Sequence, residues 1–210
     1  MPLHPSGAAL FAGSAREFIE MAPASNLTAH LTREFNRRWG TAGESEVRSW
    51  RKSLTSLAGV VVEADLDQSG VGVELKLPLT DKRIDASFIG RDRNGRPGVV
   101  LVELKQWATV AASRFPDNVL VGGQERLHPS IQVGSYAAYL RDSHSAFTEE
   151  GFGLSACAFL HSLSSIDAAP IRSPIYQSAL RDARLYAADE GASLGAVSYT
   201  HLTLPTIYSV

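Results

Sequence analysis

The chain has 210 residues, of which 44% are hydrophobic and 20% charged, so it is long enough to bury a core and has the composition of one globular domain. Its formal net charge of −2 excludes a strongly basic nucleic-acid coat protein, and any contact with a polyanion must come from a local patch. Cys157 is the only cysteine, which excludes an intramolecular disulfide and a zinc–thiolate site and fits a reducing compartment. No apolar run approaches the ~18 residues that a membrane span needs, and no secretory leader is visible. We therefore expect a cytoplasmic protein without a membrane partner.

Three helices are predicted in the first third of the chain. Ser14 and Glu17 have the spacing of a capping box, which starts a short helix. Apolar residues then recur at intervals of four over residues 27–39, a pattern typical of an amphipathic helix packed on a core. A third helix is expected over residues 45–58, and the following Val60–Val62 fits either the end of that helix or a short strand.

Three strands are predicted next. Residues 71–78 alternate apolar and polar side chains, which indicates a half-buried strand. Residues 83–89 form the second strand. The third, residues 99–107, opens with four consecutive aliphatic residues, typical of a strand covered on both faces. The intervening residues 91–98 are rich in turn formers and are expected to fold the second strand against the third.

The third strand continues into charged residues, and this is the most informative feature of the chain. Successive strand side chains alternate faces, so Glu103 and Lys105 share one face. The turn before the strand should bring Asp85 beside them. Two carboxylates and a lysine would then meet at one end of a sheet, which is the arrangement that a divalent metal ion and an activated water require.

The alternative for this pattern is an ordinary ion pair between Glu103 and Lys105 on a half-exposed strand. Burying an unpaired carboxylate costs several kcal/mol, so a carboxylate that directly follows an apolar run is normally compensated by a partner charge or a metal. The additional Asp85 favours the catalytic interpretation. The surrounding segment, residues 82–105, carries six cations and three anions, which also provides a local basic patch.

A further helix and a fourth strand complete the predicted core. Pro129 is suited to the first turn of a helix, in which Gln132 and Tyr136 lie four residues apart on one face. Residues 156–161 form an apolar run that indicates the fourth strand. His161, at its end, is either a site residue or a hydrogen-bonded boundary residue, and the second interpretation is favoured.

These motifs resemble the PD-(D/E)xK nuclease superfamily. Asp85, the Glu103-Leu104-Lys105 tripeptide and the pair Gln132 and Tyr136 match its motifs position by position, although Ile84 stands where the superfamily usually has a proline. A narrower resemblance is to the amino-terminal region of bacterial Schlafen-like DNA/RNA helicase proteins. Four segments carry it: residues 46–50, 82–85, 102–107 and 128–132.

The resemblance implies a fold of the α/β (α+β) class, with a restriction-endonuclease-like αβββαβ core, a mixed sheet flanked by helices, and an N-terminal helical extension. It implies Mg²⁺ or Mn²⁺ held by Asp85 and Glu103, with Lys105 orienting the attacking water. Glu46 would add a metal ligand, or is simply an acidic residue favoured in a first helical turn. Gln132 and Tyr136 would contact the metal-bound water or the phosphate backbone, or else belong to the core.

The predicted organisation is an N-terminal helical extension (1–44), a truncated nuclease-like domain (45–196) and a non-native tail (197–210) that looks like translated adaptor sequence. In the resembling family a helicase domain follows. The expected function is metal-dependent hydrolysis of DNA or RNA. The alternative is an inactive nucleic-acid-binding or docking module of a helicase.

Overall fold

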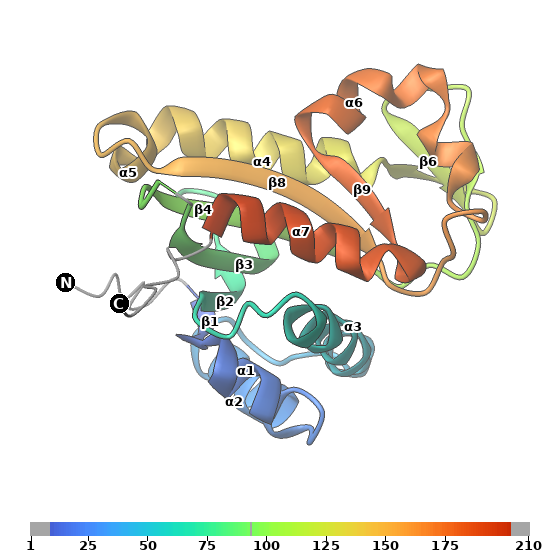
Figure 1. Ribbon diagram of the computed structural model, residues 1–210. Helices are drawn as coiled ribbons and strands as arrows, with labels where there is room; N and C mark the ends of the chain where they lie inside the picture. Colours follow the sequence, from blue (N-terminus) through green and yellow to red (C-terminus); the bar gives the residue numbers. More distant parts are fainter. Residues whose placement is uncertain (1–8, 93, 203–210) are drawn as a thin grey trace.

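A computed structural model describes residues 9–92 and 94–202, with side chains described as far as residue 196. Its centre is a six-stranded mixed sheet with helices on both faces, and a three-stranded sheet lies at one end (Figure 1). This confirms the predicted mixed α/β class with a helix-flanked mixed sheet. Among the described residues, no helix combines the length and apolar character needed to cross a bilayer.

The helices are α1 (Ala15–Met21), α2 (Asn26–Arg38), α3 (Glu44–Glu63), α4 (Pro129–Ser143), α5 (Ser145–Thr148), α6 (Gln177–Asp182) and α7 (Gly191–Leu202), with 3₁₀ turns η1 (Ala169–Arg172), η2 (Pro174–Tyr176) and η3 (Ala188–Glu190). The strands are β1 (Ala9–Ser14), β2 (Gly70–Lys76), β3 (Arg83–Arg91), β4 (Pro97–Lys105), β5 (Ala111–Ala112), β6 (Asn118–Val121), β7 (Gln124–Leu127), β8 (Gly153–Leu160) and β9 (Arg184–Ala187).

The large sheet has the strand order β1-β2-β3-β4-β8-β9. The first four strands are antiparallel to their neighbours, whereas β8 is parallel to β4 and β9 is parallel to β8. Since α4 lies between β4 and β8 in the chain, it forms the crossover that a parallel pair needs. The chain contains, in the predicted order, the elements α3, β2, β3, β4, α4 and β8, with the small strands β5–β7 between β4 and α4 and the short helix α5 before β8.

The predicted helices are present, with one difference in length. The Ser14 hydroxyl and the Glu17 carboxylate form the expected capping box at the start of α1. Helix α3 runs on to Glu63, so Val60–Val62 belong to the helix and not to a strand. Val60 and Val61 are buried in the core, and this packing extends the helix beyond Gly59.

Two strands of the large sheet were not predicted from the sequence. Strand β1 lies within the predicted N-terminal helical extension and pairs with β2 at the sheet edge. Strand β9 follows α6 and forms the opposite edge. The segments 9–14 and 184–187 are short, and their strand character depends on pairing with residues far away in the chain.

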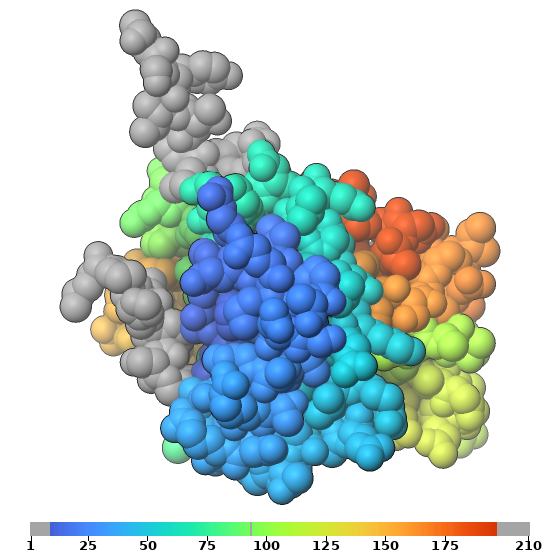
Figure 2. Space-filling view, turned by 90° about the horizontal axis from the view of Figure 1, so that it is seen from below, coloured from blue at the N-terminus to red at the C-terminus, as the bar shows by residue number. Residues whose placement is uncertain are grey.

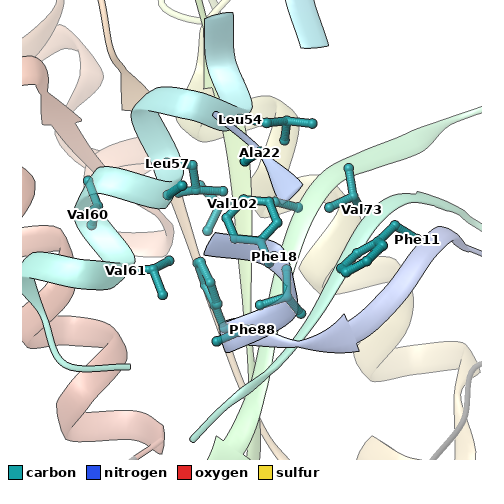
Figure 3. Packing of buried hydrophobic residues seen from close by; sticks show 14 of the residues in the cluster. Phe11, Phe18, Ala22, Leu54, Leu57, Val60, Val61, Val73, Phe88 and Val102 are labelled. Atoms are coloured by element: carbon teal, nitrogen blue, oxygen red, sulfur yellow. The ribbon is translucent and has the colours of Figure 1, made fainter. Parts of the chain in front are cut away.

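The largest hydrophobic cluster lies between the sheet and helices α1, α2, α3 and α7 (Figure 3). Phe18 and Leu57 are fully buried there and meet Phe88 from the sheet. From that side, the residues of β1 and α1–α3 form one continuous surface (Figure 2). A second cluster, on the opposite face, packs α4 through Val133, Ala137 and Leu140.

The glycine- and proline-rich segment between β4 and α4 folds into the small sheet β5-β6-β7. Gly122 and Gly123 form the two-residue turn between β6 and β7, with φ of 58° and 77°, and glycine adopts such positive φ values without strain. At the carboxyl end, α7 includes the first residues of the predicted tail, and residues 203–210 lie outside the described part of the chain.

Candidate active site

The predicted site residues of β3 and β4 lie side by side at one end of the sheet. The last paired residues of the two strands at this end are Ala86 and Val102, so the next position in the register sets Asp85 opposite Glu103. Regular pairing stops there. Instead, the Oδ2 atom of Asp85 accepts a hydrogen bond of 2.7 Å from the backbone N–H of Leu104.

The neighbouring strand β2 is also irregular at this point. Val73 packs with the cluster under α1–α3, whereas Leu75 packs with the cluster under α4, so the strand changes faces at Glu74. Glu74 has a φ of 53°, a value that strands do not use, and it falls opposite Asp85 between paired residues. Interruptions of this kind re-aim side chains and are frequent beside active sites. Here they bring a third carboxylate close to the predicted pair.

Lys105 connects the predicted residues of β4 with those of α4. Its Nζ donates to Oε1 of Glu103 at 2.6 Å and to Oε1 of Gln132 at 3.1 Å. The amide group of Gln132 in turn donates to the hydroxyl of Tyr136 at 3.1 Å. The structure therefore brings five predicted residues together, with Asp85 beside Glu103 at one end of this chain of hydrogen bonds.

The two central carboxyl groups are unfavourably placed for negative charge. Glu103 is only 2% exposed, and its Oε2 atom is buried without a hydrogen-bond partner. Burial raises the pKa of Glu103 to about 8, and the charge of Asp85 adds to the rise. Burial also raises the pKa of Asp85, although the backbone N–H of Leu104 and the charge of Lys105 oppose this. Two adjacent desolvated carboxyl groups attract either protons or a cation.

Glu46 is the predicted residue contributed by α3, and it faces Arg83. The Arg83 guanidinium lies 2.5 Å from Oε1 of Glu46 and 2.9 Å from Oε2 of Glu74. The indole N–H of Trp50 donates to the other Glu74 oxygen at 2.7 Å. Burial raises the pKa of Glu74 to about 7, with a further contribution from the charge of Asp85. These ion pairs tie the first turns of α3 to the strands that carry the site.

The predicted residues except Tyr136 line one cavity of about 540 Å³. Helix α3 forms one wall through Glu46, Ser49 and Ser53, and the end of β4 with Trp107 and Gln132 forms the other. Tyr136 is 7% exposed and packs in the cluster under α4, so it reaches the site only through its hydroxyl group and Gln132. His161 is hydrogen-bonded to the hydroxyls of Ser53 and Ser162, at 2.9 and 3.2 Å.

The donor set suits a hard divalent cation. Mg²⁺ and Mn²⁺ prefer carboxylate oxygens, and Oε2 of Glu103, which has no hydrogen-bond partner among the described residues, would be free to bind such an ion. Among the side chains that the structure describes, in residues 9–92 and 94–196, no cluster of three or more Asp, Glu, His or Cys residues has the geometry of a metal site. Asp85 and Glu103 would therefore supply two protein ligands, and Glu46 as a third ligand stays a prediction.

Sequence reasoning missed Glu74 and its partner Trp50. Glu74 sits within an alternating strand pattern that assigns it to the solvent side together with Lys76. In the structure it is 6% exposed because the positive φ turns it toward α3. The only sequence signal is that Glu74 lies in the predicted strand directly before the strand of Asp85. Two strands joined by a short connection usually pair, and such pairing can set Glu74 beside Asp85.

Comparison with protein-family models gives no match for this chain, and a search among curated proteins gives none either.

Proposed function

We propose that the chain is a metal-dependent phosphodiester hydrolase that cuts DNA or RNA at the cavity between α3 and the end of β4. The observation that carries this proposal is the juxtaposition of Asp85 and Glu103, two desolvated carboxyl groups, with Lys105 hydrogen-bonded to one of them. Buried carboxyl groups with strongly raised pKa values in a cleft are typical of functional sites.

The topology supports assignment to the PD-(D/E)xK superfamily with a restriction-endonuclease-like core. Three antiparallel strands, β2 to β4, are followed by a crossover helix and the parallel strand β8. The Asp, the Glu-x-Lys and the Gln-x-x-x-Tyr motifs lie on β3, β4 and α4 and converge on one sheet end. In the Schlafen-like helicase proteins that the motifs resemble, such a region precedes a helicase domain, and we extend the proposal to a longer nuclease–helicase chain.

Each residue of the site would have its own role in the proposed hydrolysis. Asp85 and Glu103 would hold Mg²⁺ or Mn²⁺, which supplies a water of lowered pKa and offsets charge on the phosphate. Lys105 lies beside Glu103 and would orient the attacking water and stabilise the negative charge that develops in the transition state. Gln132 holds the Lys105 ammonium from the other side and thereby fixes its direction.

The alternative function is a nucleic-acid-binding or docking module without hydrolytic activity. One observation favours it: Glu103 and Glu46 already have cationic partners, Lys105 and Arg83, so part of the site is satisfied as a structural ion-pair network. This module would bind nucleic acid with a strong dependence on salt concentration and no requirement for a divalent metal.

The deciding experiment incubates the purified chain with end-labelled single- and double-stranded DNA and RNA in Mg²⁺, Mn²⁺ or EDTA. We expect divalent-dependent cleavage that D85N, E103Q and K105A each reduce by at least 10²-fold, the usual size of loss for a catalytic group. E150Q is the matched control, because Glu150 is exposed and precedes β8 at the opposite end of the sheet. Intact substrate under every divalent ion would refute the hydrolase and favour the module.

A further inference from the structure

The wall of the cavity beyond Lys105 carries an aromatic ring that the proposed chemistry does not use. Trp107 lies in the loop after β4, is partly exposed and lines the cavity. One part of its side chain packs against the hydrophobic cluster around Leu160 and Tyr176, which holds the ring in place. The Lys105 ammonium lies 5.7 Å from the centre of the ring. A fixed aromatic surface beside a cation is a combination that nucleic-acid bases and their phosphates recognise.

Helix α3 contributes hydrogen-bonding groups to the same cavity. Ser49 and Ser53 lie four residues apart on α3, and both line the cavity. The Ser53 hydroxyl is hydrogen-bonded to the His161 imidazole, so it is held in position. Exposed Arg51 and Lys52 on the same helix add positive charge. Hydroxyl, imidazole and ammonium groups are ordinary partners of a phosphate backbone.

The aromatic ring and the position of the carboxyl groups favour unpaired over paired nucleic acid. A base can stack on a protein ring only when one of its faces is free, and inside a duplex both faces are covered by neighbouring bases. Glu103 lines the cavity and is only 2% exposed. The strand that is cut must therefore enter between α3 and the loop of Trp107, which suits a single strand.

We propose that Trp107 stacks an unpaired base next to the scissile phosphate while Ser49 and Ser53, the latter held in position by His161, bind the adjoining backbone, so that the substrate is single-stranded nucleic acid. This inference rests on the proposed hydrolase activity, because only a hydrolase has a scissile phosphate. Binding at the subsite can nevertheless be tested without cleavage. DNA and RNA share the chemistry that the subsite recognises, and the experiment includes both.

The test measures binding of labelled single-stranded DNA, single-stranded RNA and blunt duplex to the full chain in EDTA. We expect at least one of the single strands to bind at least tenfold more tightly than duplex. W107L, which keeps apolar packing but removes the ring, should weaken this binding by about tenfold, the loss expected for one stacked base. W107F should stay within about threefold. F115A is the control, since Phe115 is exposed in the connection between β5 and β6, also after β4 in the chain, but does not line the cavity.

Tryptophan fluorescence gives an independent signal from the ring itself. The chain has three tryptophans, and two of them, Trp107 and the buried Trp50, line the cavity. Stacking should quench the emission of Trp107 in the wild type, so most of the quench should be lost in W107F although the oligonucleotide still binds. Thermal melts of each variant confirm that the protein is folded.

The outcomes separate this inference from the proposed function. Equal binding of duplex and single strand, or unchanged binding by W107L, overturns the single-strand subsite even if Mn²⁺-dependent cleavage is observed. Trp107-dependent binding of single strands without cleavage under any divalent ion supports the subsite and refutes the hydrolase.

Discussion

Asp85 replaces a backbone group as the hydrogen-bond partner of Leu104: its Oδ2 atom accepts the Leu104 N–H at 2.7 Å. Because Leu104 lies between Glu103 and Lys105, this one bond fixes the end of β4 relative to β3 at the point where the ladder stops. The position of the candidate site thus depends on an interrupted ladder between two interior strands, and Asp85, which interrupts it, is also one of the two proposed metal ligands.

The ion pair of Lys105 and Glu103 should be strongly coupled in stability. K105M leaves a second buried oxygen of Glu103 without a donor, and we expect a loss of about 1–3 kcal/mol in the free energy of unfolding. In E103L/K105M both partners are removed, so the double variant should lose less than the sum of the single variants. Urea unfolding measures all three. Additive losses would show that the two side chains do not depend on each other.

Glu46 and Arg83 should affect the affinity for the metal ion through the contact that they make with each other. E46Q removes one charge of the pair, and R83K removes the planar fork that bridges Glu46 and Glu74. We expect each variant to weaken Mn²⁺ binding by about tenfold, the lower end of the range for groups that orient metal ligands. Calorimetric titration with Mn²⁺ measures the affinity.

The double variant E46Q/R83K should bind Mn²⁺ little worse than either single variant, because both changes break the same contact. R37K serves as a control, since Arg37 is an exposed arginine on α2 that pairs with Glu34 outside the cavity. Unchanged Mn²⁺ affinity in E46Q would remove Glu46 from the site.

The sequence was sufficient for the parts of the site that follow from local periodicity. Side-chain alternation sets Glu103 and Lys105 on one face, and the turn at residues 91–98 brings Asp85 to them, as the structure shows. Glu74 could not be predicted in the same way. Its burial depends on a positive φ and on Trp50, 24 residues away, so no local pattern indicates it.

The same distinction applies to the strands. The interior strands β3 and β4 have strong aliphatic patterns, whereas the edge strands β1 and β9 are short segments of 6 and 4 residues. Whether so short an edge segment forms a strand depends more on pairing with the neighbouring strand than on its own residues.

Gln132 should matter more to activity than Tyr136. Gln132 contacts the Lys105 ammonium directly, whereas the Tyr136 hydroxyl contacts only the Gln132 amide. We expect Q132A to lower the cleavage rate by about 10–100-fold, and Y136F by less than tenfold, on the scale of groups that orient a reacting group. The cleavage rates of the two variants and the wild type are measured under single-turnover conditions with saturating Mn²⁺. A larger loss in Y136F than in Q132A would place the tyrosine in contact with substrate.

The carboxyl groups of the site should make the metal-free protein less stable as pH rises. In the unfolded chain glutamate loses its proton near its ordinary pKa of about 4.3, whereas the pKa in the folded protein is about 7 for Glu74 and about 8 for Glu103. Between these values the folded form binds more protons than the unfolded form, so the free energy of unfolding falls with increasing pH. Urea unfolding in EDTA from pH 5 to pH 8.5 should show this decline, and E103Q should flatten it.

A bound divalent ion should reverse that dependence, because it takes the place of the protons on Asp85 and Glu103. We expect Mn²⁺ to raise the melting temperature more at pH 8 than at pH 6, where protons compete with the metal. D85N and E103Q should each abolish most of the shift, whereas E150Q, an exposed carboxylate at the other end of the sheet, should leave it unchanged. The readout needs no substrate, so it tests the metal site separately from nuclease activity. A shift that is equal at both pH values, or that survives in D85N, would place the bound ion away from these two carboxyl groups.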